Sequence, residues 1–140
     1  MTTNQPTNLL TLEKDVFSCD DAAKAKGIPL KNELKSLVIV TSKGEYLLHL
    51  RGDRLANWRT LKKLLQCDQV FLAPPEVLAK YDCCHGTVNP FNEKLAKLPQ
   101  IVSRELLELE FVSTNAGTHR TYVKFDPKLL SEMGEVIFID

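Results

Sequence analysis

Two nearly continuous apolar runs separated by a short turn constrain the fold of this chain most. The runs cover residues 35–40 and 45–50, and Ser42, Lys43 and Gly44 lie between them. Residues such as Val and Ile favour strands, and a short glycine-containing connection favours an antiparallel hairpin. The runs do not alternate between apolar and polar residues, which is typical of strands covered on both faces. The sequence therefore predicts a central β-hairpin with other elements packed on both sides.

Three segments have the signals of helices. Ser18 and Asp21 resemble a capping box before residues 19–26, and Gly27 supplies a stop. Apolar residues recur at helical spacing over 54–65, and the basic residues among them indicate a solvated face or a guide for an RNA phosphate. The third helix is predicted to start at Pro74-Pro75-Glu76 and run to about residue 81.

The remaining extended segments alternate irregularly with these helices. The predicted extended or strand segments are residues 9–17, 70–72, 98–102, 109–113, 121–125 and 136–139, with a helical turn over 103–107 and a helix start at Asp126-Pro127. Because no regular βαβ period is present, we expect an α/β (α+β) fold built on a mixed sheet. The glycine patterns of Rossmann and P-loop proteins are absent, which excludes the simplest nucleotide-cofactor function.

Length and charge limit the function classes further. With 140 residues and 44% hydrophobic residues, we expect a flexible N-terminus over 1–8 and one domain over 9–140. The 18 basic and 18 acidic side chains cancel, so binding of nucleic acid by phosphate neutralisation alone is excluded. The longest apolar run, residues 37–40, is too short for a membrane span, and the start lacks the pattern of a signal peptide. We expect a cytoplasmic protein with no membrane partner.

The four cysteines do not form a metal-binding pattern. No C-x-x-C spacing occurs, and a cytoplasmic location predicts reduced thiols. Cys83-Cys84-His85 has the residue types of a thiol nucleophile or a metal site, but adjacent cysteines are awkward zinc ligands and no second pair completes the set. We predict no metal and no cofactor. A thiol or metal enzyme built on Cys83-Cys84-His85 is kept only as a third hypothesis, beside an enzyme of another kind and a binding protein.

The loop over residues 86–91 has residue types suited to chemistry at the backbone. Gly86 opens the loop and permits close approach of a ligand, and Pro90 restricts its far end. Backbone amides held in such a loop can stabilise an oxyanion, although an isolated G-x-x-x-P pattern is more often a surface turn. A second small-residue loop, 114–119, delivers His119 to the start of a strand. His119 is equally compatible with an active histidine and with a strand-edge one, and His49 fits a structural residue or a pocket-lining one.

Three parts of the sequence, taken in order, form a family pattern. They are Lys35 before an apolar strand, the Gly86-Thr87-Val88-Asn89-Pro90-Phe91 loop, and Asn115-Ala116-Gly117-Thr118-His119. The chain resembles the YbaK-type aminoacyl-tRNA deacylases, which include the editing domain of bacterial prolyl-tRNA synthetases, from about residue 9 to residue 140. This resemblance implies a curved mixed sheet flanked by helices. It also implies hydrolysis of the ester that joins a wrongly attached amino acid to tRNA.

The resemblance also implies roles for single residues. Lys35 would hold the terminal phosphate or adenosine, the Gly86–Pro90 backbone would contact the aminoacyl group, and His119 would lie near the carbonyl or amino group. The expected catalytic residues are Lys35, Gly86, Thr87 and His119, and the expected substrate-binding residues are Val88, Asn89, Pro90, Asn115 and Gly117.

Two departures from the family pattern limit what can be transferred. His85 stands where the family often has proline, and Lys31-Asn32 is not followed directly by the strand that an alanine-specific subgroup shows. We expect a trans-acting deacylase for mischarged tRNA that carries Ala, Ser, Thr or Cys, acting alone or beside a synthetase. The alternative is a relative that binds tRNA or a protein without turnover.

Overall fold

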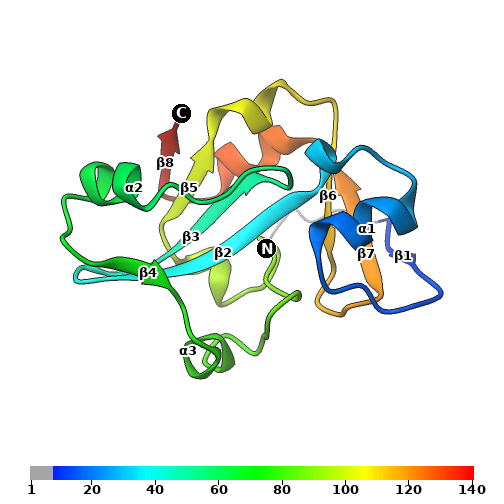
Figure 1. Ribbon diagram of the computed structural model, residues 1–140, viewed down its shortest axis with the longest axis horizontal. Helices are drawn as coiled ribbons and strands as arrows, with labels where there is room; N and C mark the ends of the chain where they lie inside the picture. Colours follow the sequence, from blue (N-terminus) through cyan, green and yellow to red (C-terminus); the bar gives the residue numbers. More distant parts are fainter. Residues whose placement is uncertain (1–7) are drawn as a thin grey trace.

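The computed structural model describes residues 8–140, so nearly all of the predicted flexible segment 1–8 lies outside the described residues. The described chain is one mixed α/β domain with two sheets, which confirms the predicted fold class. In Figure 1, α2 (Trp58–Leu65) and β8 (Val136–Ile139) lie at one end, and α1 (Cys19–Lys26) and β7 (Thr121–Phe125) lie at the other. The central hairpin runs between the two ends.

The hairpin predicted from the apolar runs is the centre of a five-stranded sheet. It consists of β2 (Leu34–Thr41) and β3 (Gly44–Arg51), paired antiparallel from Leu34↔Arg51 to Thr41↔Gly44. The sheet order is β4-β2-β3-β5-β8, where β4 is Val70–Leu72 and β5 is Gln100–Ser103. Because β5 runs parallel to both β3 and β8 while β4 is antiparallel to β2, the sheet is mixed.

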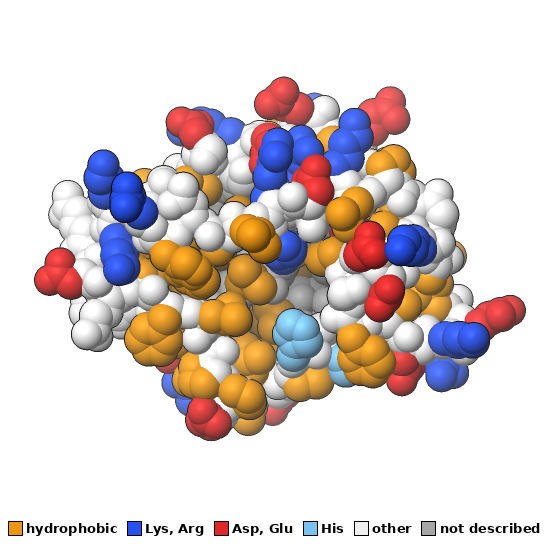
Figure 2. All heavy atoms as spheres, in the orientation of Figure 1, with side chains coloured by type: hydrophobic (Ala, Val, Ile, Leu, Met, Phe, Trp, Pro, Cys, Tyr) orange, Lys and Arg blue, Asp and Glu red, His pale blue; other side chains and the backbone are white. Residues whose placement is uncertain are grey.

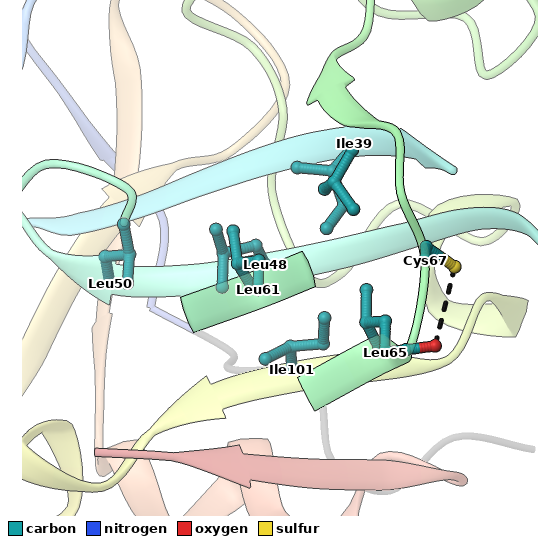
Figure 3. Close-up of a cluster of buried hydrophobic side chains, with 8 residues drawn as sticks. Ile39, Leu48, Leu50, Leu61, Leu65, Cys67 and Ile101 are labelled. Carbon is teal, nitrogen blue, oxygen red and sulfur yellow. Dashed lines mark hydrogen bonds between the residues drawn. The ribbon is translucent and has the colours of Figure 1, made fainter. Parts of the chain in front are cut away.

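Both faces of this hairpin are buried, as its continuous apolar runs predict. On one face, Leu61 and Leu65 of α2 pack against side chains of β2, β3 and β5 (Figure 3). On the other face, Val38 and Leu47 pack with Val88 and with residues around α3 (Pro75–Ala79). The second contact anchors the middle of the 86–91 loop in the hydrophobic core. The same packing that forms the sheet therefore positions the candidate loop.

A smaller antiparallel sheet completes the domain. It has the order β1-β7-β6, where β1 is Leu10–Thr11 and β6 is Val112–Asn115. A parallel bridge between Glu33 and Ser113 links it to the segment that enters β2. The fold thus contains two sheets joined at this bridge. Short 3₁₀ helices fill the connections, namely η1 (Leu30–Asn32), η2 (Leu95–Lys97), η3 (Arg104–Glu108) and η4 (Pro127–Glu132).

Local capping explains where the helices follow the predictions and where they do not. In α1, Asp21 N donates to Ser18 Oγ at 3.1 Å and Gly27 adopts φ 70°, so the predicted bounds are confirmed. In contrast, α2 begins at Trp58 rather than at residue 54, because Asn57 Oδ1 accepts from Thr60 N and caps the helix there.

Three further boundaries differ from the predictions. The third helix ends at Ala79, and only Leu10–Thr11 of the 9–17 segment pair as a strand. The strand predicted over 109–113 begins at Val112, because the 3₁₀ helix η3 extends to Glu108 and delays it.

The packing of α2 on the sheet yields a stability prediction. Leu61 is 1% exposed, whereas Leu64 on the same helix is 36% exposed. We expect Leu61→Ala to lower the free energy of unfolding by about 2–5 kcal/mol, because it leaves a cavity in the core. Leu64→Ala, the matched control, should change it by less than about 1 kcal/mol. Urea unfolding measures both, and equal losses would contradict the packing described here.

Candidate active site

A cavity of about 850 Å³ lies between α1, β2 and three loops. Figure 2 shows a hollow near the middle of this face, bordered by hydrophobic and histidine side chains. Five of the nine expected site residues line the cavity: Lys35, Gly86, Val88, Asn115 and His119. They come from β2, the 86–91 loop and the 115–119 loop, which are far apart in the chain. The fold therefore brings the three parts of the sequence pattern to one place.

Gly86 and His119 are in direct contact. Gly86 has φ 91°, and a Cβ atom at this position would lie 2.8 Å from His119 Cδ2. His119 Nε2 lies 2.8 Å from the carbonyl oxygen of His85. Because a carbonyl oxygen only accepts, His119 carries its proton on Nε2. The glycine thus lets the imidazole ring lie against the loop backbone, which the sequence pattern alone did not reveal.

The N-terminal segment holds His119 from the other side. Phe17 packs its ring on the imidazole, with ring centroids 4.4 Å apart. Val16 N donates to the carbonyl oxygen of His119 at 2.7 Å, next to the pairing of β1 with β7. The histidine is therefore fixed through both its ring and its backbone.

Two asparagines clamp the two loops together. Asn89 Nδ2 donates to Asn115 Oδ1 at 3.2 Å, and Asn115 Nδ2 donates to the carbonyl oxygen of Val88 at 2.8 Å. Asn115 Oδ1 also accepts from Gly117 N at 3.0 Å. Asn89 is thus buried and joins the two loops, whereas Gly117 is exposed and lines the second hollow described below. Pro90 is buried and does not line the cavity.

Thr87 is turned away from the cavity. Its Oγ1 accepts from Cys84 N at 2.9 Å and donates to the carbonyl oxygen of Cys84 at 3.0 Å, which closes the turn before Gly86. Thr87 lines a second hollow of about 610 Å³ with the two adjacent cysteines and His119. Burial raises the pKa of the Cys83 thiol, which disfavours the thiolate that a nucleophile needs.

Lys35 lies at the opposite wall, on the strand that leads into the core. Its Nζ donates to the carbonyl oxygen of Arg54, so the ammonium group is held against the loop after β3. That loop is fixed in turn by the Arg54 guanidinium, which makes two contacts of 3.1 Å with the Glu105 carboxylate. The cavity lining also includes the charged residues Lys26, Glu33 and Asp20.

A buried ion pair, which no sequence pattern indicated, also lines the cavity. Lys26 Nζ lies 3.0 Å from Glu33 Oε2 and donates to Ser113 Oγ at 2.9 Å. The two charged side chains are only 2% and 4% exposed. Burial lowers the pKa of Lys26 and raises that of Glu33, and their mutual attraction opposes both shifts. Lys26 ends a short helix and looks like a solvated residue in the sequence, so no local signal reveals its burial.

His49 proves to be structural. It is fully buried on β3, where Nδ1 lies 2.8 Å from Ser36 Oγ and Nε2 lies 2.7 Å from Gln100 Oε1. Burial lowers the pKa of His49 to about 4, so the ring is neutral at neutral pH. Its hydrogen bonds tie β2 to β3 and to β5.

Two negative findings concern residues 8–140 alone. No group of three or more His, Cys, Asp or Glu side chains within this range is arranged to hold a metal ion. No helix in the same range has the length and apolar character needed to cross a membrane.

The fold and site define an editing-domain protein. The family model of the aminoacyl-tRNA editing domain matches residues 13–132, so the chain belongs to this family. A proline–tRNA ligase from Nitrosomonas eutropha is 31% identical over 119 residues, which cover 82% of this chain. The chain spans only about 20% of that ligase.

Solved structures share the whole fold. One, described as a candidate trans-editing enzyme for prolyl-tRNA synthetase, has 27% identity and a TM-score of 0.84, and the match covers 95% of this chain and 84% of that one. Hypothetical protein APE2540 has 25% identity and a TM-score of 0.80, with 94% and 88% covered. The predicted resemblance to YbaK-type editing domains is thereby confirmed.

The contact between Gly86 and His119 leads to a prediction about the loop. Gly86→Ala should lower the free energy of unfolding by more than about 2 kcal/mol, because it adds a clash to the strain of a positive φ. The matched control is Gly134→Ala, since Gly134 has φ 68° and no atom lies within 4 Å of the point that an added methyl group would occupy. We expect that control to lose only about 1 kcal/mol. Equal losses in urea unfolding would contradict the proposed contact.

The burial of His49 predicts a pH dependence of stability. The unfolded chain binds a proton at this ring near pH 6.5, whereas the folded protein binds it only near pH 4. The free energy of unfolding should therefore fall between these values as pH decreases, by at most about 3 kcal/mol from this group. His49→Gln should flatten the decrease, whereas His85→Gln, which changes an exposed ring, should not. Urea unfolding from pH 7 to pH 4 tests this, and parallel curves for both variants would refute it.

Proposed function

We propose that this protein is a trans-acting aminoacyl-tRNA deacylase that removes a small amino acid of the Ala, Ser, Thr or Cys class from mischarged tRNA. The observation that carries the proposal is the cavity that Lys35, Gly86 and His119 line together. Membership of the editing-domain family supplies the reaction class. The substrate is the acceptor end of the tRNA with its terminal adenosine, and an aminoacyl-tRNA synthetase is the second partner that this function would call for.

The reaction needs little from the protein beyond positioning. A water molecule attacks the ester carbonyl carbon, and the carbon–oxygen bond to the ribose breaks. One proton of the water goes to the ribose oxygen, the other is released to solvent, and the amino acid leaves with its carboxylate. An aminoacyl ester is already activated, so binding in the right geometry and stabilising the oxyanion can account for catalysis. Gly86 presents bare backbone to the cavity, which suits the oxyanion role.

Lys35 and His119 have separate tasks in this scheme. The Lys35 ammonium acts as a point charge that holds the phosphate or ribose of the terminal nucleotide. His119, with its proton on Nε2 directed to the His85 carbonyl oxygen, orients the aminoacyl end rather than acting through that proton. Neither role requires a protein nucleophile, so Cys83 and Cys84 take no part.

The wall formed by α1 supports a small amino acid. Cys19 and Ala22 line the cavity with short side chains, and the buried Lys26–Glu33 pair lines it as well. A pocket of this kind accepts a small side chain, but one methylene group changes discrimination by only about 1–3 kcal/mol. Because charged tRNA is used in the cytoplasm, we expect the protein to act there.

Removal of the Lys35 charge tests the proposal. We expect Lys35→Ala to lower kcat/KM for deacylation by about 10- to 100-fold, since a hydrogen bond to a charged group contributes about 1.5–3 kcal/mol. Lys31→Ala is the control, because Lys31 is exposed and does not line the cavity. A panel of tRNAs mischarged with Ala, Ser, Thr and Cys provides the substrates.

Two results would count against the proposal. If no member of the panel is hydrolysed faster than in buffer, the protein is not a deacylase for these substrates. Binding of charged tRNA with the ester left intact would instead support the alternative, a tRNA-binding relative without turnover.

A further inference from the structure

Large apolar side chains are exposed at the mouth of the cavity. Phe17, Leu55 and Leu72 all line it, and they are 57%, 87% and 50% exposed. They come from the segment before α1, the loop before α2 and the end of β4. Clustering of exposed apolar side chains at one opening is typical of a binding surface. Hydrophobic side chains beside the hollow are visible in Figure 2.

Two of these residues are poorly explained by packing. Leu55 lies on the loop that carries the Arg54 carbonyl to Lys35, yet its own side chain is almost entirely in solvent. Phe17 covers one side of the His119 ring and leaves more than half of its surface open. Both side chains line the cavity and are exposed. An aromatic ring such as that of Phe17 is the kind of surface on which a nucleobase stacks, and an exposed leucine adds apolar contact.

The size of the cavity sets which part of an RNA strand reaches this rim. This inference rests on the proposed function, in which the ester is attached to the last nucleotide. A volume of about 850 Å³ suits a drug-sized ligand, which is the size of an aminoacylated nucleoside. With the terminal adenosine inside, the preceding unpaired nucleotide must lie at the mouth.

The neutral charge of the protein favours stacking as the means of holding that nucleotide. The 18 basic residues are balanced by 18 acidic ones, so phosphate neutralisation supplies little affinity. Base stacking does not depend on net charge, and it tolerates any base. Exposed apolar and aromatic side chains at the rim therefore suit a protein that cannot hold a nucleotide by excess positive charge.

We propose that Phe17 and Leu55 form a stacking platform for the unpaired base that precedes the terminal adenosine. They are positioning residues, since they hold the strand and do not touch the ester. Their effect should appear only with substrates that contain this second nucleotide.

The test compares two substrates on the same variants. One is the full aminoacyl-tRNA, and the other is the same amino acid esterified to adenosine alone. Leu55→Ser should lower kcat/KM on the tRNA by about tenfold or more, mainly through KM, and change it on aminoacyl-adenosine by less than about twofold. Phe17→Ala also removes a contact of the His119 ring, so it should lower kcat/KM on both substrates, and about tenfold more on the tRNA than on aminoacyl-adenosine. Phe17→Trp should retain activity on the tRNA, because its ring also stacks.

Phe71→Ala is the matched control. Phe71 is 49% exposed, close to the exposure of Phe17, but it does not line the cavity. This variant should hydrolyse both substrates at the wild-type rate. Leu55→Ser matters most among the rim variants, because the exposed Leu55 side chain can be removed without disturbing His119.

Each other outcome rejects a defined statement. Equal losses on both substrates would show that the platform acts on the terminal nucleoside or on the fold, and no loss with tRNA would show that the base does not stack there. A loss that arises only when a synthetase is added would identify a protein-docking surface instead. If the wild-type protein hydrolyses neither substrate, the proposed function fails and this inference fails with it; every other negative result leaves the proposed function intact.

Discussion

Burial of the β2–β3 hairpin on both faces is the constraint on which the rest of the structure depends. One face needs α2, and the other needs the segment that carries Val88. Burial of the second face also positions the candidate site, because Val88 follows Gly86 by two residues in the same loop. A loop that would otherwise be free to move is thus held by the hydrophobic effect, and its backbone is aimed at the cavity without a helix or strand of its own.

Polar contacts then set the geometry that hydrophobic packing leaves open. The Asn89–Asn115 pair joins the two loops, and Gly86 admits the His119 ring. Directional bonds are suited to this task because they fix relative orientation as well as distance. The Lys26–Glu33 pair is a different case. Burying two charges offers little net stability, but it leaves a polar wall whose position is fixed by Ser113.

The sequence was informative where the physics is local or periodic. The hairpin followed from two apolar runs, and the bounds of α1 followed from Ser18 and Gly27. The pattern of Lys35, Gly86 and His119 pointed to residues that do share one cavity. Their catalytic and binding roles remain predictions, since geometry alone does not measure them.

The features that could not be predicted from the sequence depend on side-chain contacts, several of them between distant segments. Asn57 determined the start of α2 through one side-chain bond, and the burial of Lys26 arises from Glu33 and Ser113 packing around it. Thr87 was expected among the catalytic residues, yet its hydroxyl is engaged with Cys84. No local pattern distinguishes a threonine that closes a turn from one that faces a ligand.

The contact of Gly86 with His119 also bears on when the protein can act. The cavity is assembled from segments that span residues 12–122, so no short stretch of chain contains it. Contacts of such long sequence separation form late and cooperatively during folding. A partly folded chain would therefore lack the cavity altogether, and any function that needs it would begin only once the whole domain is native.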